Sequence, residues 1–176
     1  MMETKDVGKL ILPRMLTLIT CDDGVSGVDA MPLDMIIPIS SRPNIIMIVL
    51  PPECKTFQNI LGQEKFVINV LPRTYLDKIL GCAKTYPRGV DKLGQVGLTS
   101  YPSEKTGLKR VKEAKAWIEC RLSNKMKVGE NMLVFAEPEC IEVDDSIYID
   151  GDIDIVKIDP PMRISESGFV GIHSGG

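Results

Sequence analysis

The best candidate for a site of chemistry in this sequence is a place suited to a phosphate group. Lys55 and Thr56 stand at the predicted start of a helix, where an ammonium, a hydroxyl and free backbone N–H groups converge on the positive end of the helix dipole. This set of donors is typical of anion binding. A simpler interpretation also accounts for the pair, because Thr56 can cap its own helix while Lys55 is solvated beside it.

The side chains most used in catalysis are scarce. The only histidine, His173, lies close to the C-terminus, so neither Ser-His-Asp nor Cys-His catalysis nor an imidazole-rich metal site is expected. The cysteines are widely spaced, form no Cys-x-x-Cys pair and are predicted to be small buried hydrophobes: Cys21, Cys54, Cys82, Cys120 and Cys140. We therefore predict no catalytic and no metal-binding residues, and an enzyme of this sequence would take its reactive group from a cofactor.

Two further groups of polar residues allow more than one interpretation. The acidic stretch over residues 150–154 resembles a calcium-binding loop, but it lacks the length and the terminal glutamate of one, so a solvated hairpin turn explains it better. Ser40 and Ser41 either donate hydrogen bonds to a ligand or satisfy the backbone of their own loop. The residues alone do not decide between these two roles.

Composition bounds the class of protein. The chain has 176 residues, of which 44% are hydrophobic and 26% charged, with a formal net charge of −3. This is the composition of an ordinary globular protein, and the length fits one domain spanning residues 1–176. Because no basic stripe is present, nucleic acid is not an expected partner. Because neither a signal peptide nor an apolar segment of membrane-spanning length is found, we expect a cytoplasmic protein without a membrane partner.

Runs of β-branched and aliphatic residues predict most of the secondary structure. Residues 10–20 predict a strand that ends in a turn at residues 22–24, and residues 24–32 a returning edge strand, because Pro32 is tolerated only at an edge or a bulge. Residues 44–50 form a nearly continuous apolar run, which is typical of a strand buried on both faces. Further strands are expected over residues 66–71, 116–122, 132–136, 140–144, 147–149 and 153–158.

Helical patterns are few and short. One helix is predicted over residues 56–61, with Thr56 as its N-cap, and a second over residues 75–80, while residues 38–43 are expected to form a loop. Residues 82–110 are polar and rich in Gly and Pro, so we expect a long excursion with little regular structure that serves as a lid or a dimer arm. The fold class that follows is mainly β, an antiparallel β-barrel with a few short helices.

An ordered series of motifs along nearly the whole chain resembles the flavin reductase-like family. No single motif is diagnostic, and the resemblance rests on their order. The motifs are residues 17–20, 27–34 (Gly-Val-Asp-Ala-Met-Pro-Leu-Asp), 38–43 (Pro-Ile-Ser-Ser-Arg-Pro), 55–60 (Lys-Thr-Phe-Gln-Asn-Ile), 66–69, 81–83, 89–92, 114–120 and 128–131. The resemblance implies an FMN-binding split barrel of the flavoredoxin-like kind, and a homodimer with flavin near the subunit interface.

The resemblance also implies which residues contact the cofactor. The segment from Asp29 to Ser41 would lie along the isoalloxazine ring and the ribityl chain. The region from Lys55 to Asn59 would receive the phosphate, which favours the phosphate interpretation of its first two residues. The full set of predicted cofactor-binding residues is Asp29, Ala30, Met31, Pro32, Ser40, Ser41, Lys55, Thr56, Asn59, Asn69 and Lys92.

The function that the resemblance implies is flavin-dependent redox chemistry. NAD(P)H or another reduced donor would pass a hydride to FMN, with FAD as the alternative cofactor, and the electrons would go on to a small molecule or a protein. Three positions depart from the family pattern: Asp29 stands where many members carry asparagine, Asp34 where they carry serine, and Asn131 where histidine is frequent. These departures motivate two alternatives, a non-catalytic split-barrel protein that binds flavin or another planar cofactor, and a structural dimer without a cofactor.

Overall fold

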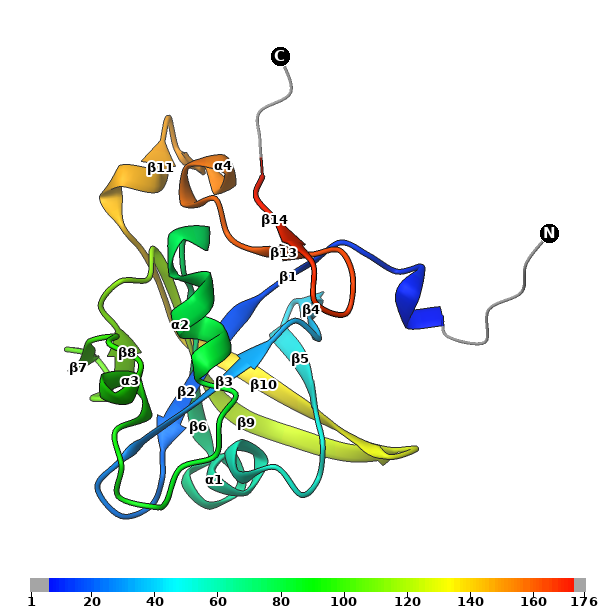
Figure 1. The fold of residues 1–176 in the computed structure, drawn as a ribbon, viewed down its shortest axis with the longest axis vertical. Coiled ribbons are helices and arrows are strands. Elements are labelled where there is room, and N and C mark those ends of the chain that lie inside the picture. Colours follow the sequence, from blue (N-terminus) through cyan, green and yellow to red (C-terminus); the bar gives the residue numbers. More distant parts are fainter. Residues whose placement is uncertain (1–6, 173–176) are drawn as a thin grey trace.

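Most of the described chain lies in one curved antiparallel sheet. The computed structural model describes residues 7–172, and Figure 1 shows the long strands of the sheet curving around a common interior. In spatial order the seven strands are β3 (Val28–Leu33), β2 (Thr17–Asp22), β6 (Lys65–Val70), β9 (Ala116–Val128), β10 (Asn131–Val143), β5 (Asn44–Leu50) and β4 (Ile36–Ser41). Each strand pairs antiparallel with its neighbours.

The two edge strands of this sheet are consecutive in the chain. β3 and β4 lie at opposite edges, but only Asp34 and Met35 connect them, and the N–H of Val49 donates to the carbonyl of Met35 where the chain turns the corner. The sheet must therefore curl until both edges reach the same corner, which makes an open barrel. This confirms the predicted fold class of a mainly β barrel with short helices.

Alternate residues of the strands fill the barrel interior. Ile46, Ile48 and Leu50 of β5 point inward and are buried, whereas the residues between them, such as Met47, are partly exposed on the outer face. In the single chain β5 is therefore buried on one face, not on both as its apolar run indicated. All five cysteines are free thiols and four of them are buried, in agreement with their prediction as small hydrophobes.

A second apolar core lies on the outer face of β2, β3 and β6, under a layer of short elements. The layer consists of η2 (Arg73–Tyr75), α2 (Leu76–Gly81), α3 (Lys92–Gln95) and a hairpin formed by β7 (Ser100–Pro102) and β8 (Lys109–Val111). Leu18 and Val67 of the sheet meet Ile79 and Leu93 of the layer in this core. Residues 82–110 therefore contain more regular structure than their composition indicated, and they cover the barrel wall.

The structure corrects the sequence-based expectations at three other places. Of the predicted loop over residues 38–43, residues 38–41 belong to β4 (Ile36–Ser41), because they pair with β5. The predicted strands 132–136 and 140–144 are one strand, β10, since register shifts in its pairing carry it past Pro138. The predicted strand 153–158 becomes helix α4 (Ile155–Ile158), because the side chain of Asp154 accepts hydrogen bonds from two N–H groups of its first turn.

The two ends of the described chain meet beside the barrel. β1 (Arg14–Met15) pairs with β13 (Met162–Arg163), which pairs with β14 (Phe169–Val170), so the strand predicted from residue 10 begins only at Arg14. The remaining elements are η1 (Val7–Lys9), η3 (Asp145–Ile147), β11 (Tyr148–Ile149) and β12 (Asp152–Ile153). The last two form a hairpin whose turn, Asp150 and Gly151, begins the acidic stretch, so the predicted hairpin turn is present there. Within residues 7–172 no helix is long and apolar enough to cross a membrane, and His173 lies outside the described residues.

Candidate functional site

Four of the predicted cofactor-binding residues form one buried polar cluster, the Asp29 cluster, at the start of β3. The carboxylate of Asp29 accepts hydrogen bonds at Oδ2 from the Thr56 hydroxyl (2.7 Å) and from the Asn59 amide (3.2 Å). The Nζ atom of Lys92 lies 2.8 Å from Oδ1 of Asp29 and also donates to the carbonyl oxygen of Ala30. The contact between Nζ and Oδ1 has the distance of an ion pair but is not aligned as a hydrogen bond.

The Asp29 cluster connects three elements, and its two opposite charges compensate each other. The Asp29 side chain is 0% exposed and the Lys92 side chain 8%, and an uncompensated charge at that depth costs several kcal/mol. α1 (Lys55–Gln63) supplies two hydrogen-bond donors, β3 supplies the carboxylate and α3 supplies the cation. The polar groups of Thr56, Asn59 and Lys92 are therefore directed at Asp29, and the cluster holds α1 and α3 against β3.

Lys55 is placed differently from the residues of the Asp29 cluster. Helix α1 starts at Lys55, and its N-cap is Cys54, whose sulfur accepts a backbone N–H of the first turn, so Thr56 is not the cap that the sequence indicated. Thr56 is 3% exposed, whereas Lys55 is partly exposed, with Nζ 3.4 Å from the carbonyl oxygens of Tyr86 and Pro87. Contacts of this length are weak, so the ammonium can turn toward an anion at the helix start.

Asp23 clamps the segment that leads to Lys92 onto the turn between β2 and β3. Its carboxylate accepts hydrogen bonds from N–H groups of the turn itself and from the N–H of Gly89. Burial alone would raise the pKa of Asp23, but these hydrogen bonds outweigh it and hold the pKa below its usual value. Gly27 is required in this turn, because a Cβ atom would lie 2.6 Å from the carbonyl oxygen of Val90. The contact between the turn and Gly89 thus positions the backbone shortly before Lys92.

Two other predicted residues are engaged inside the protein. The Asn69 amide donates to the carbonyl of Leu18 (2.9 Å), and its Oδ1 accepts from the N–H of Val111 (2.9 Å), so Asn69 attaches the β7–β8 hairpin to the sheet. Ala30 is fully buried in the outer apolar core. Both residues therefore support the barrel wall from within.

The predicted set divides into two groups along β3 and β4. Ser40 and Ser41 pair with the start of β5, and that strand, roughly 20 Å long, separates them from the residues that lead into α1. The Ser40 hydroxyl oxygen accepts a hydrogen bond from the N–H of Arg42 (3.3 Å), and Ser41 is exposed. Met31 and Pro32 lie on β3 beyond the Asp29 cluster and are partly exposed. In one chain the structure therefore brings four predicted residues together and leaves the serines apart.

A comparison with known protein families identifies the family of this chain. A family model described as a flavin reductase like domain matches residues 9–156. The chain belongs to the flavin reductase-like family. This confirms the resemblance carried by the order of the motifs, and the family is one that binds flavin.

Known proteins resemble this flavin reductase-like chain at low sequence identity, one by its sequence and two by their solved structures. An uncharacterized protein of Aquifex aeolicus is 26% identical over 169 residues, which cover 92% of this chain and 85% of that protein. Flavoredoxin of Desulfovibrio vulgaris superposes with a TM-score of 0.88 at 24% identity, over 99% of this chain and 95% of that one. Nitrilotriacetate monooxygenase component B from Bacillus cereus gives a TM-score of 0.88 at 20% identity, over 99% and 94%. These likenesses confirm the split-barrel fold.

Two departures from the flavin reductase-like pattern are compensated within the chain. Lys92 compensates Asp29. Asp34, at the other end of β3, has Oδ2 3.0 Å from Nη2 of Arg14 and 2.8 Å from Nε of Arg163. Arg14 and Arg163 face each other across the β1–β13 pair. Sequence reasoning missed both arginines, because no local pattern connects either of them with Asp34.

The third departure lies elsewhere in the flavin reductase-like barrel. Asn131 begins β10 and pairs with Val128 across the tip of the β9–β10 hairpin. Figure 1 shows this tip projecting from the body of the molecule, at the end away from β13 and β14. Within one chain Asn131 therefore belongs to a different region from the two carboxylates.

The residues at the start of α1 fit a flavin phosphate in part. Lys55 offers a cation at the first turn of a nine-residue helix, where backbone N–H groups favour an anion. Thr56 and Asn59 direct their side-chain donors to Asp29 instead. The negative charge of Asp29 would repel a phosphate, but the positive charge of Lys92, 2.8 Å away, compensates it.

Proposed function

We propose that this chain is an FMN-binding flavoprotein that acts as an NAD(P)H-linked flavin reductase or passes electrons through flavin to a small molecule or a protein. The observation that carries the proposal is the family match over residues 9–156. Bound flavin would supply the redox chemistry by taking up a hydride from NAD(P)H, and FAD is the alternative cofactor. The alternative function is a non-catalytic barrel that holds flavin or another planar cofactor.

In this proposal the predicted residues divide into contacts and supports. Lys55 and the N–H groups at the start of α1 hold the phosphate. The other contacts, with the ring and the ribityl chain, come from Met31, Pro32, Ser40 and Ser41. The supports hold α1, β3, α3 and β6 together and do not contact flavin. They are Asp29, Ala30, Thr56, Asn59, Asn69 and Lys92.

A single lysine variant tests the phosphate contact. Lys55→Ala should raise the Kd for FMN about tenfold or more, because a hydrogen bond to a charged group contributes about 1.5–3 kcal/mol. Quenching of FMN fluorescence measures this Kd. Lys157→Ala is the control, since Lys157 is exposed on α4, and it should leave the Kd unchanged. Equal Kd values for the two variants would show that Lys55 does not contact the phosphate. A wild-type protein that takes up neither FMN nor FAD would contradict the proposal as a whole.

The flavin-loaded protein separates the reductase from the non-catalytic alternative. Anaerobic addition of NADH and of NADPH should bleach the visible flavin absorbance with at least one of them. The nicotinamide that bleaches the flavin faster is the preferred donor. Retention of the absorbance with both donors would favour the non-catalytic flavin-binding protein.

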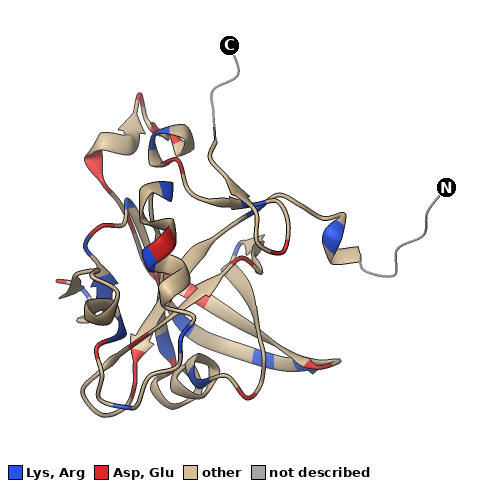
Figure 2. Cartoon of the chain, in the orientation of Figure 1, with Lys and Arg blue, Asp and Glu red and all other residues tan. Residues whose placement is uncertain are grey.

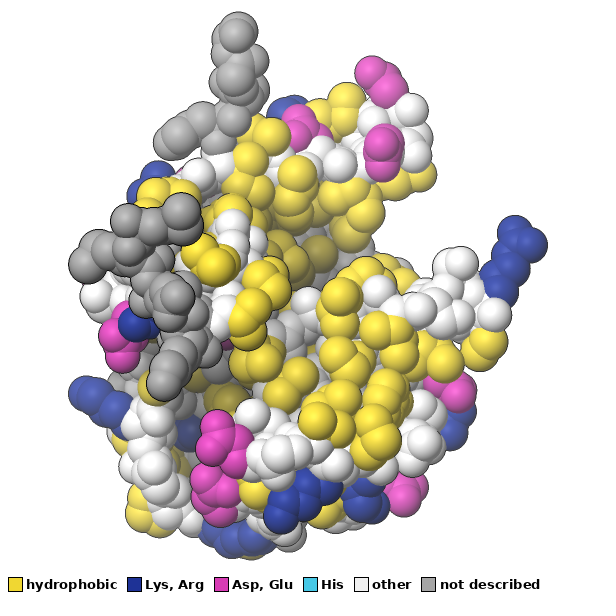
Figure 3. Space-filling view, turned by 90° about the vertical axis from the view of Figure 1, so that its right-hand side faces the viewer, with side chains coloured by type: hydrophobic (Ala, Val, Ile, Leu, Met, Phe, Trp, Pro, Cys, Tyr) yellow, Lys and Arg dark blue, Asp and Glu magenta, His cyan; other side chains and the backbone are white. Residues whose placement is uncertain are grey.

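We also propose a homodimer, in which a second copy covers the outer face of β4, β5, β10 and β9. Cross-strand neighbours form two apolar rows on that face, Ile37–Met47–Phe135 and Val49–Leu133–Met126. Ile37 is 49% exposed and Met126 50%. Figure 3 views the side that carries these strands and shows hydrophobic side chains gathered into a broad patch. A contiguous apolar patch of this kind marks an interaction surface.

Sedimentation velocity tests the dimer. The wild-type chain should sediment at about twice its mass of 19.4 kDa. Ile37→Glu should shift it to the monomer, because the variant places a charge in the apolar face. Ile141→Glu is the matched control, since Ile141 is 54% exposed on the other half of β10. A monomeric wild type, or equal effects of the two variants, would contradict this interface.

A cytoplasmic location without nucleic-acid or membrane partners is part of the proposal. The formal net charge of −3 does not favour binding to a phosphate backbone. Figure 2 shows basic and acidic residues interspersed over the described elements. The electron acceptor is therefore expected among small molecules or proteins.

A further inference from the structure

A short stretch between α2 and α3, the 85–87 loop, has its backbone attached to the rest of the protein by a single side chain. The Nζ atom of Lys55 lies 3.4 Å from the carbonyl oxygens of Tyr86 and Pro87. Within residues 7–172 these are the only hydrogen bonds to the backbone of the loop. Figure 1 shows the green segment between α2 and α3 passing beside α1. Lys55 therefore determines how firmly the loop is held.

The residues on either side of the 85–87 loop are fixed independently of Lys55. Before the loop, the N–H of Lys84 donates to the carbonyl of Gly81 at the end of α2 (3.3 Å). After the loop, the carbonyl of Asp23 accepts from Nη1 of Arg88 (3.0 Å), and the carboxylate of Asp23 accepts from the N–H of Gly89. A segment with fixed ends and one attachment in its middle can move locally while the barrel stays folded.

The attachment through Lys55 is weak enough to be exchanged. Both acceptors are neutral, and the distance of 3.4 Å is longer than the roughly 2.7–3.2 Å of an ordinary N–H···O hydrogen bond. A phosphate is negatively charged and forms shorter and stronger hydrogen bonds with an ammonium. In the proposed function the flavin phosphate lies at the start of α1, and Lys55 is the first residue of that helix. The phosphate and the loop therefore compete for the same ammonium.

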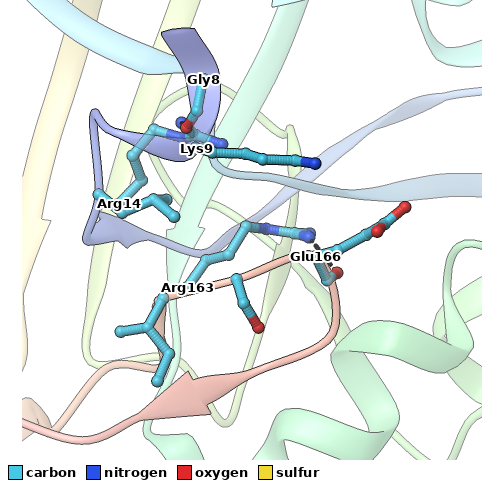
Figure 4. A pocket seen from close by; sticks show the side chains of 8 residues that line it. Gly8, Lys9, Arg14, Arg163 and Glu166 are labelled. Atoms are coloured by element: carbon cyan, nitrogen blue, oxygen red, sulfur yellow. Dashed lines mark hydrogen bonds between the residues drawn. The ribbon is translucent and has the colours of Figure 1, made fainter. Parts of the chain in front are cut away.

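The arginines in the cleft between the two ends of the described chain are held more firmly than Lys55. Oδ2 of Asp34 lies 3.1 Å from Nε and 3.0 Å from Nη2 of Arg14, and 2.8 Å from Nε of Arg163. Arg163 also donates to the carbonyl of Glu166 (2.8 Å), the hydrogen bond drawn as a dashed line in Figure 4. A phosphate at these arginines would have to compete with a carboxylate, whereas at Lys55 it competes with two neutral carbonyls.

We propose that Lys55 exchanges the carbonyls of Tyr86 and Pro87 for the phosphate of the bound flavin, so that FMN releases the 85–87 loop and riboflavin does not. This inference rests on the proposed function. Riboflavin has the ring and the ribityl chain of FMN but no phosphate, so it leaves the ammonium on the loop. Lys55 is then the residue through which the protein responds to the phosphate of a flavin.

Limited trypsin digestion of the full chain tests the exchange, with mass spectrometry to identify the bonds that are cut. Lys84 is exposed and directly precedes the 85–87 loop, and proteases cut where the chain is exposed and mobile. Saturating FMN should raise the rate of cleavage after Lys84 about three- to tenfold, the effect of losing about one hydrogen bond, and saturating riboflavin should leave it unchanged. Cleavage after Lys157, which is exposed on α4, is the internal control and should be the same in all samples.

Two variants of Lys55 show whether the response runs through this side chain. Without any ligand, Lys55→Ala should be cleaved after Lys84 about three- to tenfold faster than the wild type, and saturating FMN should add nothing further. Lys55→Arg keeps a cation at the start of α1 and should retain the response to FMN.

The inference is overturned if ligand-free wild type and Lys55→Ala are cleaved after Lys84 at equal rates. It is also overturned if bound FMN does not speed this cleavage, or if riboflavin speeds it equally. Fluorescence quenching measures FMN binding separately, so a protein that binds no FMN contradicts the proposed function. The ligand-free comparison of Lys55→Ala with the wild type still decides whether Lys55 holds the loop.

Discussion

Replacing Lys92 with methionine should lower the free energy of unfolding by about 3–5 kcal/mol, because it leaves a buried carboxylate without its cation. Methionine keeps most of the apolar stem of lysine, so the loss comes from the charge. The Asp29 side chain is 0% exposed and retains only the neutral donors of Thr56 and Asn59 in the variant. Urea denaturation followed by circular dichroism measures the change.

The pairing of Asp29 with Lys92 predicts non-additivity. Asp29→Asn should also destabilise the protein, yet the double variant Asp29→Asn/Lys92→Met should lose clearly less than the sum of the two single changes, because neither charge is left uncompensated. Lys84→Met provides the control, since Lys84 is exposed, and it should change the free energy of unfolding by less than about 0.5 kcal/mol. Simple additivity in the double variant would contradict the pairing.

The same measurements separate supports from contacts in the proposed flavin site. Lys55→Ala should weaken FMN binding with little effect on the free energy of unfolding, because the contacts of Lys55 with the carbonyls of Tyr86 and Pro87 are long and its side chain is partly exposed. Lys92→Met should act first on unfolding, since Lys92 holds α3 to β3. The two lysines stand together in the predicted set, and their different burial gives them different expected phenotypes.

Replacing Arg110 with methionine should also lower the free energy of unfolding by about 3–5 kcal/mol. Arg110 is 3% exposed and bridges the carboxylates of Glu119 and Glu142, which joins β8 to β9 and β10. Glu119 is 0% exposed, and within residues 7–172 its Oε2 atom has no hydrogen-bond partner. Loss of Arg110 would leave that carboxylate buried and uncompensated. Urea denaturation at neutral pH measures the effect.

Arg110 should also shape the response to acid. Its hydrogen bond to Glu142, with a further one from Lys105, lowers the pKa of Glu142 from 4.5 to about 2. Because the folded-state pKa lies below the unfolded one, this contribution to stability is complete above pH 4.5 and is lost as the pH falls toward about 2. In Arg110→Met the decline in stability between these pH values should be shallower. Urea midpoints measured across this range for both proteins test the difference.

Arg121→Met is the control for the effect of Arg110 on stability at neutral pH. Arg121 contacts Glu137 and Glu139, but its side chain is 47% exposed. Exposed ion pairs contribute about 0–1 kcal/mol, so the loss at neutral pH should stay within that range. A loss as large as that of Arg110→Met would show that burial does not control the cost of breaking these pairs.

The sequence located most strands of the barrel interior, because local patterns determine them. The apolar run over residues 44–50 coincides with β5, and the prediction for residues 66–71 differs from β6 by one residue at each end. Edge elements were less predictable. Residues 36–41 include Pro38 and two serines, which are typical of a loop, and they form β4 only because β5 offers a partner strand. Pairing across the sheet is not encoded within the segment itself.

The candidate site shows the same division between local and distant information. The order of the motifs was enough to select Asp29, Thr56, Asn59 and Lys92, because the family pattern is written along the chain. Only the tertiary structure decided that these four contact one another, and that Arg14 and Arg163 meet at Asp34. The physical reason is that a buried or partly buried charge is compensated by whatever cation the folded chain brings near it. That neighbour is set by the closure of the barrel and not by position in the sequence.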